Sequence, residues 1–437
     1  MAQAAGAQAA RPNVLLITTD QQSMHALGAN GNPHLETPAM DSIAADGVSF
    51  TESYCTYPVC SPARSSVMTG LMPHETGVMR NGEAIADGIP NLGEHFRAHG
   101  YETFYAGKWH LPGGFGEPAG FERLIGGHTL GAHMDEPLAT KCVEFMHGGP
   151  AEPFLLVASF MNPHDVCHWI RGHEGSRDYD SVARFPAAPG NMWRDPDEPE
   201  YMQHHRYGNF NRMSNSLHIS KEWRADDFRH YVHDYYRMCE DVDRQIGRVL
   251  SALRFRGLAE NTVIALTSDH GEGLGAHRWT QKAAFWEETA KVPLIIAGRG
   301  VERRAVVDSD ALASGVDILP TLCDYAGVPA PSRVTGRTLR PAIRGEAFDR
   351  RFVVSELSDL GFPGREGRMV RTERYKYVAF NGGERPEQFF DLDLDPGEVS
   401  NLAGDPGARA RLERHRGLLR EWTDRTRDEF RIPAGAA

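Results

Sequence analysis

Residues 263–271 read VIALTSDHG, and residues 14–21 contain the similar stretch VLLITTDQ. In each stretch a short apolar run leads into an aspartate. Such runs are typical of strands buried on both faces, as in a parallel sheet. Two further runs, FLLVA at 154–158 and VPLII at 292–296, have the same character. We therefore predict that these four runs are buried parallel strands, and that their arrangement decides the fold.

Helical patterns lie between the predicted strands. The clearest covers residues 242–253, where Val242, Ile246 and Val249 fall on one helix face. Gly257 is suited to end that helix, and the strand at 263 follows. Alternation of strands and helices predicts the α/β class, with helices on both sides of one sheet.

Beyond about residue 345 the pattern changes to short strand-like runs with turn residues between them. The runs are residues 352–354, 368–371, 376–380 and 388–392, and a charged helical stretch follows at 408–425. We predict a large α/β domain over residues 11–345 and a C-terminal α+β subdomain over residues 346–437. In the subdomain, a small antiparallel sheet and a helix would pack on the large domain.

Residues 1–10 are rich in Ala, Gln and Gly. They lack the basic segment and the apolar segment of an intact secretory signal, so we expect a disordered leader. As written, the chain is predicted to be cytoplasmic. The alternative is a periplasmic or secreted protein from which a signal peptide has been removed.

Charge and composition exclude several classes of partner. The 437 residues carry a net charge of -12, and phosphate binding needs a positive field, so a nucleic-acid partner is not expected. No apolar run reaches ~18 residues, so no membrane span is expected. The six cysteines form no CxxC pair, which predicts buried thiols rather than a disulfide scaffold. The oligomeric state stays open.

The polar residues that follow the first and third strand runs suggest a metal site. Ligands of open α/β sheets bind beyond the carboxyl ends of the strands. Asp20 with Gln21, and Asp269 with His270, would meet at that edge. Oxygen donors suit calcium, magnesium or manganese, whereas an imidazole favours manganese or zinc. For either aspartate alone, capping of the next helix is the better interpretation.

Residues 60–70, CSPARSSVMTG, read as a short capped helix. Ser61 suits the N-cap, Pro62 the first turn and Gly70 the end. Cys60 would then lie at a helix N-terminus, where free N–H groups favour an anion, with Arg64 one turn further in. The alternative is an inert buried cysteine beside an ordinary helix.

The pentapeptide CSPAR at 60–64 resembles the signature of the type I sulfatases, the formylglycine-dependent family of the alkaline phosphatase superfamily. Residues 106–111 (AGKWHL), 267–271 (TSDHG) and 391–398 (DLDLDPGE) resemble other motifs of the family, and the resemblance covers roughly residues 11 to 405. It implies a sulfuric ester hydrolase with a large mixed, mostly parallel sheet sandwiched by helices. It also implies that a formylglycine-generating enzyme converts Cys60 to formylglycine (3-oxoalanine).

The resemblance implies one divalent cation held by Asp20, Gln21, modified Cys60, Asp269 and His270. Calcium is the expected ion, with manganese or magnesium as alternatives. Gln21 and His270 stand where many members have Asp and Asn. Choline sulfatases, phosphonate monoesterases and some polysaccharide sulfatases share this pattern. A hydrolase of phosphonate or phosphate monoesters or diesters is therefore the alternative function.

The same resemblance assigns the catalytic side chains. Arg64, Lys108 and Lys282 would clamp the sulfate, and His110 would orient the hydrated formylglycine. One hydroxyl of that diol would attack sulfur while His164 protonates the leaving alcohol. Loss of a proton from the second hydroxyl, with help from His110, would then release sulfate and restore the aldehyde. Taken alone, either lysine would be a surface charge and either histidine a packed core residue.

The stretch from about residue 162 to 230 is rich in His, Arg, Trp and Tyr and has weak periodicity. It predicts a long excursion from the sheet that lines the site entrance. The candidate substrate contacts are His133, His168, Trp169 and Arg171. Aromatic faces and guanidinium groups suit an anionic sugar, so a sulfated carbohydrate is preferred over an aryl or choline ester. The alternative is that these side chains pack the loop onto the core.

Overall fold

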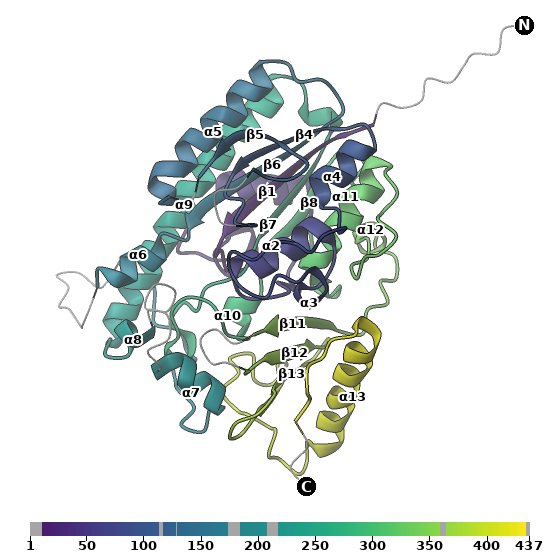
Figure 1. Ribbon diagram of the computed structural model, residues 1–437. Helices are drawn as coiled ribbons and strands as arrows, with labels where there is room; N and C mark the ends of the chain where they lie inside the picture. The colour runs from purple at the N-terminus through teal and green to yellow at the C-terminus, as the bar shows by residue number, and fades with distance from the viewer. Residues whose placement is uncertain are drawn as a thin grey trace, which may run out of the picture.

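A computed structural model of the protein describes residues 11–112, 117–127, 129–173, 184–207, 217–358 and 364–433. The predicted leader, residues 1–10, lies outside this part of the chain. At the centre is a sheet that, within the described residues, has eight strands in the order β5-β4-β6-β1-β7-β8-β2-β9 (Figure 1). The strands are Asn13–Asp20 (β1), Gly47–Phe50 (β2), Glu102–Gly107 (β4), Glu122–Gly126 (β5), Phe154–Pro163 (β6), Thr262–Ser268 (β7), Leu294–Gly298 (β8) and Val306–Asp308 (β9).

The sheet is mixed and mostly parallel, which confirms the predicted class. Strands β5, β4, β6, β1 and β7 are all parallel to one another. Strand β8 is antiparallel to both β7 and β2. The run at 292–296 was therefore wrongly predicted to be parallel. Burial on both faces gives the same continuous apolar run in either direction, so the run itself carries no information on direction.

Helices cover both faces of the sheet because the side chains of each strand alternate between them. Leu15 and Ile17 pack against one helical layer, and Val14 and Leu16 pack against the other. The first layer contains Pro38–Ala45 (α1), Gly131–His147 (α5) and Ala225–Phe255 (α9). The second contains Cys60–Thr69 (α2), Leu92–Ala98 (α4), Ile318–Ala326 (α11) and Arg340–Arg344 (α12). Figure 1 shows the two layers on opposite sides of the strands.

The C-terminal part contains a four-stranded antiparallel sheet and a helix, as predicted. The elements are Val353–Leu357 (β11), Gly367–Arg371 (β12), Tyr375–Phe380 (β13), Glu387–Asp391 (β14) and Arg409–Thr426 (α13). The buried Lys376 links this sheet to the large domain, because its ammonium group lies 2.7 Å from a carboxylate oxygen of Glu287; it also lies 2.7 Å from one of Glu398, within the C-terminal part. The division at residues 345 and 346 stays a prediction.

The predicted excursion contains short helices rather than only loop. They are Val166–Arg171 (α6), Glu200–Tyr207 (α7) and Leu217–Ser220 (α8). Helix α9 begins at Ala225, well before the apolar pattern at 242–253. The remaining short elements are Ser53–Tyr54 (β3), Pro73–Thr76 (α3), Glu287–Ala290 (α10) and Ala313–Ser314 (β10). No helix in the described ranges has the length and apolar character needed to cross a bilayer.

Candidate active site

Two buried aspartates meet at the carboxyl edge of the large sheet. Asp20 is the last residue of β1, and Asp269 directly follows β7. The two strands are parallel neighbours, with Thr19 opposite Ser268, so their ends coincide. Asp20 is fully buried and Asp269 is 3% exposed. Carboxylates buried to this degree need positive partners, because desolvation penalises an isolated charge.

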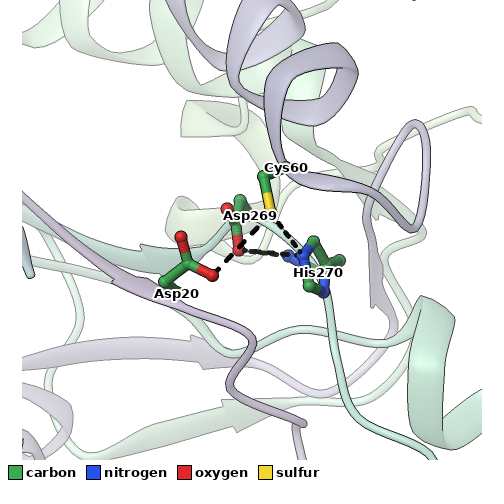
Figure 2. A group of neighbouring side chains, drawn as sticks. All are labelled: Asp20, Cys60, Asp269 and His270. Atoms are coloured by element: carbon green, nitrogen blue, oxygen red, sulfur yellow. Dashed lines mark hydrogen bonds and ion pairs between the residues drawn. The ribbon is translucent and has the colours of Figure 1, made fainter. Parts of the chain in front are cut away.

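Cys60, the first residue of α2, faces these carboxylates. Its Sγ lies 3.9 Å from Oδ1 of Asp20 and 3.2 Å from Nε2 of His270. Figure 2 shows the four side chains converging, and each offers one ligand atom within 4.8 Å of the others. Two carboxylates, an imidazole and the thiol of Cys60 are groups that can hold a divalent cation. The structure thus brings together four of the five predicted metal-binding residues.

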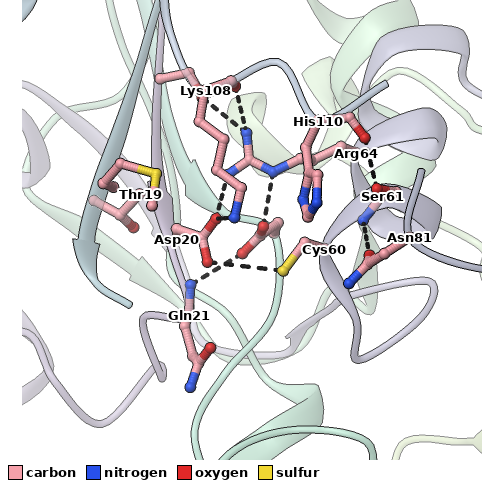
Figure 3. A network of polar contacts seen from close by, with 12 residues as sticks. Thr19, Asp20, Gln21, Cys60, Ser61, Arg64, Asn81, Lys108 and His110 are labelled. Atoms are coloured by element: carbon pink, nitrogen blue, oxygen red, sulfur yellow. Dashed lines mark hydrogen bonds and ion pairs between the residues drawn. The ribbon is translucent and has the colours of Figure 1, made fainter. Parts of the chain in front are cut away.

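The fifth, Gln21, is differently placed. Its backbone N–H donates to Oδ1 of Asp269 at 3.0 Å, but its side chain turns away from Asp20 (Figure 3). The side-chain amide donates to Glu272 at 2.5 Å and lies 3.4 Å from Sγ of Cys167. Its backbone has a φ of 71°, in the left-handed region that β-strand residues avoid. Direct coordination by Gln21 stays a prediction, and its visible contribution is to orient Asp269.

Arg64 and Lys108 neutralise the carboxylates from the opposite side. Arg64 donates from Nε to Asp269 at 2.8 Å and from a terminal nitrogen to Asp20 at 2.9 Å. Lys108, fully buried just after β4, forms an ion pair with the same oxygen of Asp20. Burial acts to raise the pKa of Asp20, as does Cys60, but Lys108 and Arg64 hold it well below its usual value.

Lys282 approaches Cys60 directly. Its Nζ lies 3.1 Å from Sγ of Cys60 and 3.4 Å from Nε2 of His270. Burial acts to raise the pKa of the Cys60 thiol, but Lys108, Lys282 and His270 hold it well below the ordinary value. An anion at position 60 is therefore strongly favoured. A sulfate group that approached this position would meet the same cations.

Two histidines complete the surroundings of Cys60. His110 follows β4 with a φ of 58°, and its carbonyl oxygen accepts from Oγ of Ser61 at 2.6 Å. Burial and the nearby Lys108 lower the pKa of its imidazole. His164 directly follows β6. Its pKa is lowered to about 3, mainly by burial and also by Lys108 and Lys282, although Asp20 opposes the shift.

Three of the four predicted substrate contacts lie along the segment after β6, and the fourth, His133, lies in α5. His168, Trp169 and Arg171 are in α6, which begins two residues after His164. The carboxylate of Asp165 accepts from the backbone N–H groups of residues 131 and 132, which ties the start of α5, and so His133, to α6. His133 and His168 are exposed. The positions of these four side chains do not test whether they contact the substrate.

Trp169 has strong packing partners of its own. Its indole nitrogen donates to Asp234 at 2.6 Å, and its ring stacks on His173 with centroids 3.6 Å apart. It also packs edge-on to Trp223. These contacts match the alternative interpretation, in which the aromatic residue fixes the loop on the core.

Sequence reasoning missed three residues that hold the site in place. Ser159 in β6 accepts from Arg64 at 2.8 Å and donates to the carbonyl of Lys108 at 2.8 Å. Asn81 accepts from the backbone N–H of residue 61 at 2.9 Å, which fixes the start of α2 (Figure 3). Glu272 is fully buried against Tyr231 and Gln21. Glu272 follows His270 by two residues, and that proximity was an available signal.

A buried carboxylate pair, an imidazole and an activated side chain at the edge of a mixed α/β sheet define a metal-dependent hydrolase of the alkaline phosphatase type. The sulfatase family description matches residues 12–328. A second description, of the C-terminal part of N-sulphoglucosamine sulphohydrolase, matches residues 275–422. The chain belongs to the sulfatase family, in the type I group that the sequence motifs indicated. It is therefore a sulfuric ester hydrolase.

Individual relatives agree with this assignment. The chain is 33% identical to a Delta 4,5-hexuronate-2-O-sulfatase of Bacteroides thetaiotaomicron, over 96% of this chain and 90% of the relative. Its fold matches the structure of a 2-O GAG sulfatase with a TM-score of 0.88 and 30% identity, over 97% and 95% of the two chains. The phosphonate monoester hydrolase of Agrobacterium radiobacter has a TM-score of 0.80 at 24% identity, over 95% and 96%, and shares the fold. Family membership implies a metal ion and a formylglycine.

Proposed function

We propose that the protein hydrolyses a sulfate ester on a sulfated carbohydrate, with formylglycine made from Cys60 as the nucleophilic residue. The observation that carries the proposal is the position of Cys60 Sγ, which lies 3.1 Å from Lys282 and 3.2 Å from His270 beside two buried carboxylates. The names of the hexuronate-2-O-sulfatase and of the 2-O GAG sulfatase support a saccharide substrate.

The cations of the site offset the charge of the ester. Lys108 and Lys282 are buried on either side of Cys60 and lower the pKa of its thiol, so their field acts at that position. Arg64 is held by Asp20 and Asp269 and therefore needs no reorganisation when substrate binds. Fixed positive groups in a dry site stabilise the negative charge that develops in the transition state.

A divalent cation held by Asp20, Asp269, His270 and residue 60 supplies polarisation of the sulfate and of the attacking hydroxyl. We propose calcium as the ion, with manganese or magnesium as alternatives, because two carboxylates dominate the donor set. Metal analysis of the purified protein, combined with reloading by each ion in turn, identifies it. Equal activity with no bound metal would exclude this part of the proposal.

His164 supplies the proton for the leaving alcohol. Without substrate its pKa is about 3, so the imidazole is neutral at pH 7. An anionic ester offsets the charge of Lys108 and Lys282, which are two causes of that low value. Binding therefore raises the pKa of His164, and the proton it gains passes to the departing oxygen. His110, also neutral, accepts a proton when the sulfate leaves residue 60.

Two measurements test the proposal. A mass spectrum of the peptide that contains residue 60 should show the aldehyde, made by a formylglycine-generating enzyme, rather than the thiol. Parallel assays on a sulfated saccharide and on a phosphonate monoester should show faster turnover of the sulfate ester. Activity on the phosphonate alone would select the alternative function. The roles of His133, His168, Trp169 and Arg171 belong to this proposal, and Arg171→Ala should raise KM while leaving kcat largely unchanged.

A further inference from the structure

A cavity of about 820 Å³ lies at the opposite end of α2 from Cys60. Ten residues of helix separate the two places, or about 14 Å at 1.5 Å per residue. The carbonyl of Gly70, where α2 ends, accepts from the backbone N–H groups of Thr335 and Gly336, which line the cavity. Figure 1 shows this end of α2 beside α3, above β11 and α13. The cavity is therefore separate from the candidate active site.

The lining of the cavity is strongly basic. Six arginines and two acidic residues, Glu75 and Asp349, line it. The arginines are Arg333, Arg337, Arg350, Arg351, Arg425 and Arg427. Guanidinium groups stay charged in proteins, so the cavity carries a local positive excess on a chain whose net charge is -12. Like charges this close repel one another, and either ion pairs within the protein or a bound anion can offset the repulsion.

The partners of these arginines neutralise only part of the charge. Arg350 forms two ion pairs with the buried Asp317 and is fixed by them. Arg351 pairs with Glu421, and its side chain is 58% exposed. Arg337 donates to a backbone oxygen of Asp349 rather than to a carboxylate. Arg333 lies 3.6 Å from a carboxylate oxygen of Glu75, so three of the six arginines have a carboxylate partner. Within the described residues, an incoming anion would also meet the guanidinium of Arg337, which donates to a backbone oxygen.

The pKa of Arg425 shows the effect of the positive charge around the cavity. Its pKa is lowered by burial and by repulsion from Arg337, Arg351 and Arg350, although Glu421 opposes the shift. Its guanidinium lies over the ring of Trp422, 5.1 Å from the centroid. Trp422 also lines the cavity, although it is only 5% exposed. A ligand with several acceptor oxygens would offset the positive charge of the guanidinium groups.

We propose that this cavity is a second, non-catalytic binding site for an anionic saccharide that carries sulfate or carboxylate groups. The volume falls within the range of small-ligand sites, roughly 300–1,000 Å³, and is far larger than one free oxyanion requires. Arginine forks match the oxygens of sulfate and carboxylate in pairs. The inference rests on the proposed function for the saccharide class of ligand.

The test uses full-length protein with Cys60→Ala, so that no turnover disturbs the titration. A heparin oligosaccharide is titrated calorimetrically into this protein, with and without Arg351→Gln plus Arg425→Gln. The double substitution should weaken the binding event at the cavity by about 10-fold or more. A matched control, Arg244→Gln plus Arg304→Gln, removes the same charge from exposed positions elsewhere and should change affinity by less than about 2-fold.

Equal weakening in both double variants, or no weakening in the first, would overturn the proposal. A second titration uses inorganic sulfate alone. If sulfate binds as tightly as the oligosaccharide, the cavity is a site for a free anion rather than for a saccharide. If the first double variant loses its melting transition, Arg333→Gln plus Arg351→Gln replaces it, since both side chains are mostly exposed. Both titrations measure binding and do not depend on catalytic activity. Absence of any sulfate-ester turnover by the unaltered protein would refute the proposed function without deciding the cavity.

Discussion

The two ends of α2 use positive charge in opposite ways. At its start, Arg64 and Lys108 are 4% and 0% exposed and are paired with Asp20 and Asp269. At its end, six arginines line an open cavity with only two acidic residues among its lining. The first arrangement is costly to disturb, because loss of one partner leaves a buried charge uncompensated. The second tolerates substitution, because water screens exposed charges.

The comparison separates chemistry from recognition. Around Cys60 the cations are fixed before substrate arrives, which suits stabilisation of a transition state. Around the cavity the guanidinium groups are partly exposed and crowded, which suits capture of an anion. Substitutions at the first end should therefore alter turnover and stability together, whereas those at the second should alter binding alone.

The largest expected effect is on turnover at residue 60. Cys60→Ala removes the residue that we propose is converted to formylglycine and should lower sulfate release by more than about 1,000-fold. The loss of turnover is measured as the rate at which sulfate is released from a sulfated saccharide. Cys55→Ala is the matched control, since Cys55 is also buried and its Sγ lies 3.9 Å from the carbonyl oxygen of Thr289. Comparable loss in both variants would show a packing effect instead.

Arg64→Met should have the largest effect on stability. The substitution leaves Asp20 and Asp269 buried with one cation fewer, at an expected cost of about 3–5 kcal/mol in the free energy of unfolding. Urea denaturation of the purified variant measures the change. A loss below about 1 kcal/mol would show that the carboxylates are compensated by other groups.

Removal of the metal should destabilise the same end of α2. A cation present at 100 times its dissociation constant stabilises the native state by about 2.7 kcal/mol, and chelation removes that contribution. Thermal melting with EDTA, and after readdition of calcium, measures the effect. In Asp269→Asn the shift should shrink, because a ligand charge is lost. An unchanged melting point with chelator in the parent protein would contradict the site.

A smaller, pH-dependent effect is expected between the two ends. His74 in α3 contacts Glu356 in β11, with Nδ1 2.6 Å from Oε1. Burial acts to lower the pKa of His74, but the hydrogen bond and charge of Glu356 raise it to about 9. A raised pKa stabilises the fold below the unfolded value of 6.5, and the contribution disappears as pH rises through about 9.

His74→Gln should therefore cost about 1–3 kcal/mol at pH 6 and nearly nothing at pH 10. Urea denaturation at the two pH values, on both proteins, gives the difference. A cost that is the same at both pH values would assign the effect to packing.

The smallest effect is expected at the exposed end. Arg351→Gln should change the free energy of unfolding by less than about 0.5 kcal/mol, because its pair with Glu421 is exposed. Its kcat on a sulfated monosaccharide should also be unchanged. Melting and steady-state kinetics, run beside Arg64→Met, test the contrast directly. A marked fall in kcat would show that Arg351 contributes to catalysis and that the cavity is not independent of the active site.

Much of the candidate site was accessible from local sequence. The apolar runs that end in Asp20 and Asp269 predicted two strand ends at one edge, and the structure pairs those strands in parallel. The residues at 60–70 predicted a helix with Ser61 as its N-cap, and the helix is present, but the N-cap is Val59 and Ser61 lies inside α2. The hydroxyl of Ser61 donates to the carbonyl of His110 instead, a remote partner that capping rules do not detect.

Other features had no local signal. The side chain of Gln21 turns toward Glu272 and Cys167, which lie far from it in sequence. The reversed direction of β8 depends on its neighbours β7 and β2 and not on its own apolar run. The arginines of the cavity come from segments as distant as residues 333 and 427, and no motif links them.

The sequence by itself determined the class of fold and the residue types at the edge of the sheet, and it predicted residue 60 as the nucleophilic position, because strand burial and ligand chemistry depend on short segments. Only the tertiary structure decided which side chains share the charge of Asp20, where Gln21 points, and that a basic cavity forms at the far end of α2. Those outcomes depend on distances between remote segments, and packing of the whole chain sets such distances.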